Sequence, residues 1–317
     1  MGTATRPPLE ARASYGARSL CPAFQWSRRL RIHVAIATVG RPELLRRAVD
    51  LIASQTRQPD GVLIVGAAEE DVGSVRESPL RPEVAFAPKG LCRQRNRALD
   101  LLAGRTDVVL FLDDDFIMAP GYLAGLEALM TGDAGIVGVT GRLLADGVRQ
   151  GGFTVEQALA MIEAHAGVEV PWELPREALY GCNMALRMAA TTGLRFDEAL
   201  PLYGWQEDVD FTAQMARRGR LVLSGQVTGV HLGVKGGRTS GTRLGYSQVA
   251  NIVYLLRKGT MPRWLGRRLL WRNVAANVLR APFPEPHVDR LGRLIGNLRA
   301  FADIALGRMD PRKIERM

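Results

Sequence analysis

Short apolar runs alternate with amphipathic stretches in the first part of the chain. The runs have the length of β-strands and are rich in Val, Ile and Leu, and the stretches between them carry apolar residues at helical spacing. Strands that alternate with helices in this way are typical of a parallel sheet covered by helices on both faces. The pattern therefore predicts an α/β fold with a mostly parallel sheet flanked by helices. The predicted strands are 32–38, 62–65, 84–86 and 108–112, and the predicted helices begin at Pro42 and Leu91.

The pattern changes after Lys258, where long amphipathic stretches follow one another without strands between them. Apolar residues stand among five arginines in 261–280, and they recur at steps of three and four in 289–306. Two outcomes remain open for such helices: they pack on the body of the protein, or they lie in a membrane interface. The chain is accordingly predicted to consist of a basic, flexible N-terminal segment, an α/β domain and a basic amphipathic helical region, with the bounds 1–31, 32–258 and 259–317.

Net charge follows the same division. The total of +10 splits into +5 for residues 1–33, −4 for residues 34–250 and +9 for residues 251–317. Basic ends around a mildly acidic body suit an anionic membrane surface, and a nucleic-acid partner is not expected. Because the three cysteines form no CxxC pair and no apolar run approaches the roughly 18 residues of a membrane span, a cytoplasmic protein is predicted, which could lie on the inner face of the cell membrane.

Three consecutive carboxylates, Asp113, Asp114 and Asp115, end the apolar run at 108–112. Side chains alternate along an extended chain, so Asp113 and Asp115 are expected on one side and Asp114 on the other. Ligands of parallel sheets bind at the carboxyl ends of the strands, and two convergent carboxylates suit Mg²⁺ or Mn²⁺ together with substrate phosphates. The alternative is an acidic turn held by arginine or by backbone amides.

A second acidic pair, Glu207 and Asp208, stands at the start of a helical stretch. The dipole at a helix N-terminus favours the ionised carboxylate, so this pair is a candidate general base. Trp205 lies beside it and could stack on a sugar. The alternative for the pair is simple helix capping.

Six segments in order resemble the glycosyltransferases of family 2, which have the GT-A fold. The resemblance extends from about Ile32 to Lys258. Its segments read ATVGRPELLRRAV, GLCRQRNRAL, FLDDDF, YGCNMALRM, WQEDVDF and VHLG.

The resemblance implies inverting transfer of a sugar from a nucleotide-diphosphate donor to the hydroxyl of a saccharide or a lipid-linked saccharide, with Mn²⁺ or Mg²⁺. In this family such reactions commonly build bacterial surface polysaccharides or exopolysaccharides. Asp208 would be the base, and Asp113, Asp115 and His231 the metal ligands, although His231 could equally be a structural histidine. The acceptor residues would be Asn183, Trp205 and Glu207. The donor residues would be Thr38, Arg41, Arg95, Asn96, Asp113 and Asp114, joined by Arg238 and Arg243 if their glycine-rich loop folds over the diphosphate rather than remaining solvated.

One segment departs from the family pattern. Family members usually carry Val-Asp-Asp-Gly-Ser after the second strand, where this chain has IVGAAEED. Gly66 and Ala67 offer no side-chain acceptor for the nucleotide base, so Glu69, Glu70 or a backbone group would have to replace them.

Two rival functions remain. A sugar-phosphate nucleotidylyltransferase is expected to carry a glycine-rich basic loop directly after the first strand, and TVGRPELL lacks one. In a non-enzymatic basic protein that binds membranes or nucleic acid, Asp115 and Asp208 would be dispensable.

Overall fold

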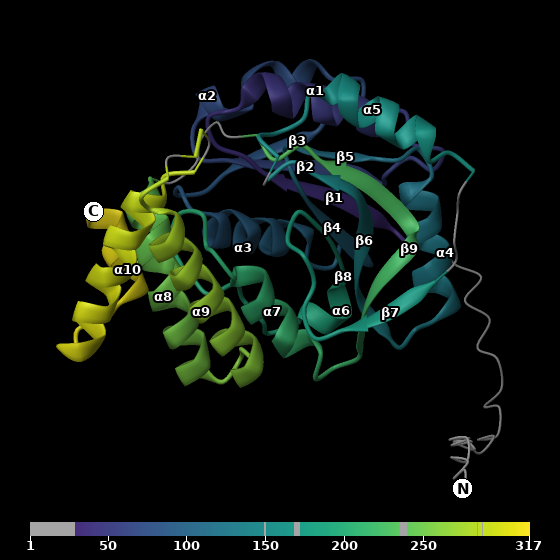
Figure 1. Cartoon of the computed structure of the whole chain (residues 1–317). Helices are drawn as coiled ribbons and strands as arrows, with labels where there is room; N and C mark the ends of the chain where they lie inside the picture. The colour runs from purple at the N-terminus through teal and green to yellow at the C-terminus, as the bar shows by residue number, and fades with distance from the viewer. Residues whose placement is uncertain (1–28, 149, 168–171, 235–239, 284, 287) are drawn as a thin grey trace, which may run out of the picture.

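The computed structural model describes residues 29–148, 150–167, 172–234, 240–283, 285–286 and 288–317. Most of the predicted N-terminal segment lies outside these residues. Within them, one sheet runs through the molecule with helices on both sides (Figure 1). The predicted α/β fold class is confirmed.

The sheet has the strand order β3-β2-β1-β4-β8-β6-β9-β5, with β7 paired to β9. The pairs among β1, β2, β3 and β4 are parallel, as predicted, and β6 is parallel to β9. The sequence pattern did not predict β8, which is inserted antiparallel between β4 and β6. The strands are β1 Ile32–Ala37, β2 Gly61–Gly66, β3 Glu83–Phe86, β4 Val108–Asp113, β5 Phe116–Met118, β6 Ile136–Asp146, β7 Glu173–Arg176, β8 Asn183–Arg187 and β9 Arg220–His231.

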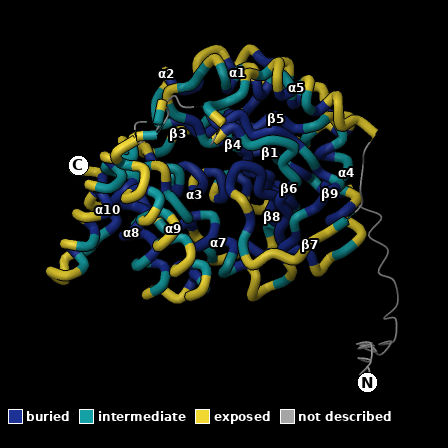
Figure 2. The backbone as a smooth tube through the Cα atoms, in the orientation of Figure 1, coloured by how far each residue is buried: buried dark blue, intermediate teal, exposed yellow. Residues whose placement is uncertain are grey.

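Alternate side chains of β1 enter two different cores. Ile32, Val34 and Ile36 pack with residues of α1 and α4, while Ala35 packs with residues of α3, α7 and α8. Both faces of the strand are thus largely buried, which explains why all its residues except His33 are apolar. Figure 2 shows the sheet as the buried interior of the molecule. The helices are α1 Pro42–Ile52, α2 Glu69–Val72, α3 Leu91–Leu102, α4 Tyr122–Gly132, α5 Val155–Ala164, α6 Met188–Thr191, α7 Glu207–Met215, α8 Gly241–Lys258, α9 Arg263–Arg280 and α10 Arg290–Ala305, with the 3₁₀ helices η1 Gly73–Glu77 and η2 Pro311–Arg316.

Strand register brings the candidate residues of two segments to one edge of the sheet. Ala37 at the end of β1 pairs with Asp113 at the end of β4. Thr38 and the three aspartates therefore follow neighbouring parallel strands at their carboxyl ends, where ligands of such sheets bind.

The C-terminal helices form a group of their own beside α3 and α7 (Figure 1). α8 and α10 are packed closely, because the glycines at their crossing bring each backbone against the other: a Cβ on Gly245 would collide with the carbonyl oxygen of Arg293. Leu265, Leu269 and Leu270 of α9 pack against the core as well. Among the residues the structure describes, no helix is long and apolar enough to cross a membrane.

Candidate active site

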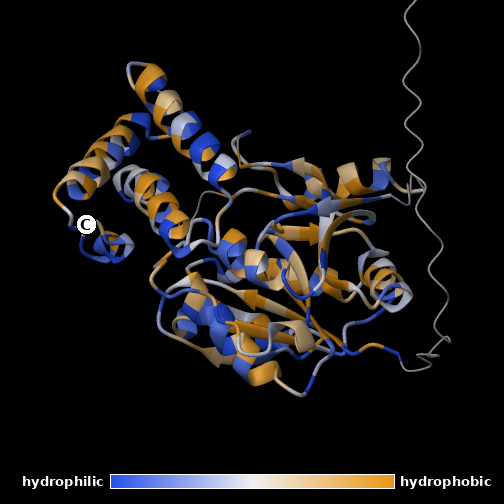
Figure 3. Cartoon of the chain, turned by 90° about the horizontal axis from the view of Figure 1, so that it is seen from below, coloured by the Kyte–Doolittle hydropathy of each residue, from blue (hydrophilic) through white to orange (hydrophobic). Residues whose placement is uncertain are grey.

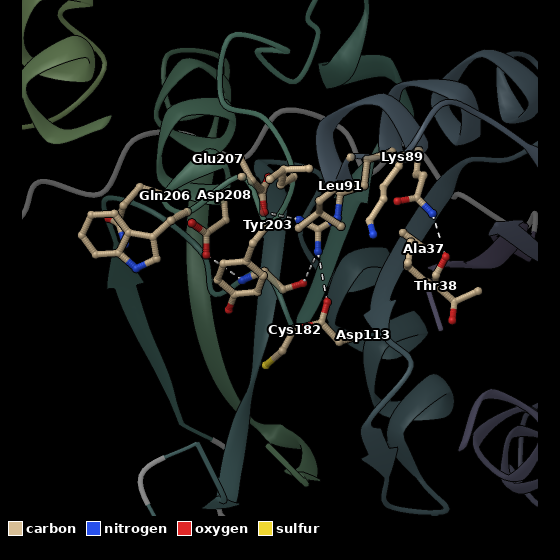
Figure 4. A pocket seen from close by; sticks show the side chains of 18 of the residues that line it. Ala37, Thr38, Lys89, Leu91, Asp113, Cys182, Tyr203, Gln206, Glu207 and Asp208 are labelled. Carbon is tan, nitrogen blue, oxygen red and sulfur yellow. Dashed lines mark hydrogen bonds and ion pairs between the residues drawn. The ribbon is translucent and has the colours of Figure 1, made fainter. Parts of the chain in front are cut away.

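A cavity of about 310 Å³ opens where the ends of β1 and β4 meet the loop before α7. Figure 4 shows Thr38 on one side of it, Asp208 on the other and Asp113 between them. The fold brings together segments that are far apart in the sequence. The predicted site residues that line the cavity are Thr38, Arg41, Arg95, Asp113, Trp205, Glu207, Asp208 and Arg243.

Arg95 links the two acidic segments. Its guanidinium is buried and donates to Glu207 at 2.5 Å and to Asp113 at 3.3 Å. The rings of Phe111 and Phe196 lie 5.5 and 5.6 Å from its central carbon, so the cation is held on aromatic faces. Arg95 thus fixes the positions of one carboxylate from each acidic segment.

Asp208 presents its carboxylate at the cavity between two backbone donors. The N–H groups of Gly181 and Val209 donate to it at 2.9 and 2.8 Å. Burial raises the pKa of Asp208, which makes it a stronger base than an ordinary aspartate once ionised.

Glu207 is less suited to that role. Burial raises its pKa to about 8, while Arg95 opposes the shift. Its Oε1 accepts from Arg95, and its Oε2 is buried without a hydrogen-bond partner among the residues that the structure describes. Glu207 therefore holds Arg95 in place, and Asp208 is the candidate base.

Asp113, Asp115 and His231 form a candidate metal group beside the cavity. One possible ligand atom from each lies within 4.8 Å of the others. His231 is the last residue of β9 and pairs with Phe116 of β5. Because Phe116 follows Asp115 in the sequence, this pairing brings His231 beside the aspartates. Two carboxylates and an imidazole are a suitable donor set for a divalent transition metal such as Mn²⁺.

Asp146 at the end of β6 orients this histidine. It lies 3.1 Å from Nδ1 of His231, so that Nε2 faces Asp115 at 3.3 Å. A carboxylate behind the histidine is the usual support of a metal-binding imidazole. Although burial lowers the pKa of His231, its hydrogen bonds to Asp115 and Asp146 raise that pKa to about 10. The carboxylates that hold the proton on His231 concentrate negative charge at this place. A divalent cation would neutralise the same charge, so the residues fit such an ion.

Asp114 points away from this group, as the alternation of side chains predicts. Its carboxylate is completely buried, accepts from the Thr38 hydroxyl at 2.8 Å and pairs with Arg41 at 2.6 Å. Arg41 also donates to Asp115 at 3.3 Å. Burial raises the pKa of Asp114 to about 7, against the opposing charge of Arg41. Asp114 therefore connects the end of β4 to the start of α1. For this residue the alternative interpretation applies, in which an acidic turn is held by arginine.

By sequence, no family profile and no curated protein matches the chain. Solved structures do resemble it. GalNAc-T7, crystallised with UDP, GalNAc and Mn²⁺, superposes with a TM-score of 0.51 at 15% identity over 81% of this chain. The structure of S. aureus TarS 1–349 superposes with a TM-score of 0.54 at 14% identity, covering 90% of this chain and 83% of TarS 1–349. The chain has the GT-A fold. It spans 59% of the GalNAc-T7 chain, so the likeness concerns the fold they share.

Five predicted site residues of this GT-A fold do not line the cavity among the described residues. Two of them, Asp115 and His231, belong to the candidate metal group beside it. Asn96 lies on the opposite side of α3, where its side chain bonds the backbone of Phe196. Asn183 is buried in the sheet and accepts from Thr140 at 2.5 Å. Both geometries favour structural roles, since each amide already serves the backbone or a neighbouring strand. Asp114 is the fifth. Arg238 lies outside the described residues.

The segment IVGAAEED at the end of β2 departs from the family pattern, and one of its carboxylates, that of Asp71, has a structural role. Asp71 turns inward and ties the loops after β1 and β2 together through backbone donors, at 2.7 to 2.9 Å. Glu69 pairs with Arg76 at the surface instead. The donors to Asp71 are the N–H groups of Gly40, Ala67 and Ala68.

The cavity also includes residues that sequence reasoning missed, among them Lys89, Gln94 and Tyr203. Tyr203 sits in a loop where Leu202, Gly204 and Gln206 have φ of 58°, 60° and 74°. Left-handed backbone at leucine and glutamine is strained, and such strain concentrates at functional sites. Gly204 was the only sequence signal for this loop.

Proposed function

We propose that this chain is an inverting, metal-dependent glycosyltransferase of family 2, which transfers a sugar from a nucleotide diphosphate to a hydroxyl acceptor. One observation carries the proposal: the carboxylate of Asp208 shares a single cavity with Asp113, which belongs to the candidate metal group. A base and a site for a leaving diphosphate are the two parts that such a transfer requires.

Two cationic side chains support donor binding at this cavity. Lys89 and Arg243 line it with Asp113, and Arg243 also donates to the backbone oxygen of Met317 at 2.7 Å. Guanidinium groups pair well with phosphate oxygens. Asp113, Asp115 and His231 would hold Mn²⁺ or Mg²⁺, which when bound supplies positive charge near the diphosphate. Thr38 and Arg41, fixed by Asp114, would shape the wall on the nucleotide side.

The proposed reaction requires one proton acceptor. The acceptor hydroxyl gives its proton to the carboxylate of Asp208, and its oxygen forms a bond to the anomeric carbon. The bond from that carbon to the diphosphate oxygen breaks on the opposite face, which inverts the configuration. The backbone donors of Gly181 and Val209 keep Asp208 aimed at the cavity throughout.

Aromatic residues support a saccharide as acceptor. Tyr203 and Trp205 line the cavity, and Tyr203 is 59% exposed. Exposed rings beside a polar cavity can stack on the apolar face of a sugar. Following the family resemblance, we propose a saccharide or lipid-linked saccharide in bacterial surface-polysaccharide or exopolysaccharide assembly.

A panel of UDP-, GDP- and dTDP-sugars tests this function. Release of nucleoside diphosphate is measured with Mn²⁺ or Mg²⁺ and again with EDTA. We expect at least one sugar nucleotide to be bound and slowly hydrolysed only with metal. If metal induces neither binding nor hydrolysis of any donor in the panel, the proposal is wrong.

A further inference from the structure

Exposed apolar side chains are concentrated in the C-terminal helices. Of the fourteen large apolar side chains that are exposed among the described residues, nine lie between Trp264 and Leu306. Trp271 is 64% exposed and Leu279 is 71% exposed. Single exposed apolar residues need no explanation, but a concentration of this kind marks an interaction surface.

Four of these nine residues, Trp264, Trp271, Val278 and Leu279, lie on one face of α9. Its inner side packs against the core through Leu265, Leu269 and Leu270. The opposite side has exposed residues at steps of three and four, which places them along one side of a helix. Figure 3 shows hydrophobic and hydrophilic positions side by side on the helices near the C-terminus, which project from the body. The outer face of α9 consists of Trp264, Arg267, Arg268, Trp271, Arg272, Val278 and Leu279.

All the charge on this face has one sign. Residues 263–280 contain five arginines and no aspartate or glutamate. Arg280 lies 3.7 Å from Glu285. Arg267, Arg268 and Arg272 form no ion pair with any residue that the structure describes. Their charge is therefore available to an anionic partner.

The charge also discriminates between partners. A second copy docked through the same face would bring like charges together, which is unfavourable for a two-fold interface. A nucleic acid would use the arginines but not a stripe of Trp, Val and Leu. Tryptophan and leucine between arginines suit the boundary between acyl chains and anionic headgroups.

We propose that the outer face of α9 binds the surface of an anionic lipid bilayer, in the plane of the interface and without crossing it. This inference goes beyond the proposed transfer reaction and does not depend on it. α8 packs on both α9 and α10, and its first turn carries Arg243 into the cavity. A bilayer bound at α9 would therefore lie one helix away from the candidate active site.

Vesicle co-sedimentation of the intact chain tests this surface. Vesicles of phosphatidylcholine alone are compared with vesicles of phosphatidylcholine and phosphatidylglycerol in equal parts, without donor or metal. We expect binding to the anionic vesicles only, weakened by salt. Arg267→Gln with Arg268→Gln should lower the partition coefficient roughly 30-fold, from about 1 kcal/mol per arginine. Trp271→Ala should lower it roughly 10-fold.

The matched control is Arg176→Gln with Arg217→Gln, two exposed arginines of the body without an ion pair to a described residue. This control should bind vesicles as the unchanged chain does. Three results would overturn the proposal: binding that ignores lipid charge, equal loss in the control, or self-association that Trp271→Ala abolishes. Tight binding of duplex DNA that is lost with Arg267→Gln and Arg268→Gln, without vesicle binding, would identify a nucleic-acid surface instead. Because the vesicle test contains no donor, its failure would not contradict the proposed transfer reaction. A negative result with the donor panel would likewise not contradict membrane binding.

Discussion

Asp113, Asp114 and Asp115 are neighbours in the chain but have different surroundings. Asp113 and Asp115 face His231, while Asp114 is buried between Thr38 and Arg41. Period-two alternation in an extended chain predicts this split. It does not predict Asp146, because the partner of a histidine depends on which strand ends lie together. The sequence signal for Asp146 is only that it ends an apolar strand, as Asp113 does.

Asp115→Asn should remove most of the metal-dependent donor hydrolysis, on the order of 100-fold, because an amide is a poorer ligand than a carboxylate. Although burial raises the pKa of Asp115, its hydrogen bond with His231 and the charge of Arg41 hold that pKa below the usual value. The variant should therefore lose some stability but keep the fold. Metal titration of donor hydrolysis and thermal unfolding measure the two effects. Asp100→Asn, a half-exposed carboxylate of α3 that pairs with Arg195, is the control. Near-normal hydrolysis in Asp115→Asn would remove this residue from the metal site.

At the scale of elements, strongly periodic segments were predictable and inserted ones were not. The four strands β1, β2, β3 and β4 lie close to their predicted bounds, and α1 and α3 begin at the predicted residues. The short helices α2 and η1 were not predicted. β8 follows a loop and is short, so its sequence does not specify an antiparallel position between β4 and β6. The predicted domain boundary at 258 falls between α8 and α9, yet α8 packs closely on α10.

Gly245→Ala should destabilise the α8–α10 contact by roughly 1–3 kcal/mol. Its Cβ would collide with the backbone of Arg293, which cannot move without shifting α10. Chemical unfolding measures the loss in free energy. Gly132→Ala in α4 is the control, because its Cβ meets nothing within 4 Å. That variant should be neutral or more stable by about 0.5–1 kcal/mol. Equal effects at both glycines would contradict the close crossing.

Asp303 of α10 gives this helix group a pH dependence. Its hydrogen bond from Lys313, with further donors in Tyr246 and Arg308, lowers the pKa of Asp303 to about 2. Since the folded pKa lies below the usual value of about 3.9, the stabilisation is complete above that value and is lost as the pH falls toward 2. Asp303→Asn should therefore be less stable than the unchanged chain at pH 7, and the gap should narrow between about pH 4 and pH 2.

Unfolding by urea at several pH values measures that gap. A gap of the same size at neutral and at acid pH would show that Asp303 contributes through packing or neutral hydrogen bonds rather than through its charge.

At the scale of the whole molecule, the ordered motifs predicted the fold class and eight of the residues that line the cavity. The order of segments along a GT-A chain fixes which strand ends meet, so residues as distant as Thr38 and Asp208 could be assigned to one site. Tyr203 and Lys89 could not, because loop conformation decides their positions. The sequence did not predict which nucleotide base the donor carries, and Asp71 and Glu69 do not indicate it, because Asp71 accepts from backbone donors and Glu69 pairs with Arg76.

The central claim is that Asp208 is the base of a sugar transfer whose donor binds beside it. Asp208→Asn retains shape but cannot accept a proton. The most direct measurement is therefore the turnover of this variant together with its dissociation constant for the nucleoside diphosphate in the presence of Mn²⁺. The account predicts a turnover lower by on the order of 100-fold or more, with diphosphate affinity nearly unchanged. Turnover near that of the unchanged chain, or an equal loss of diphosphate binding, would contradict it.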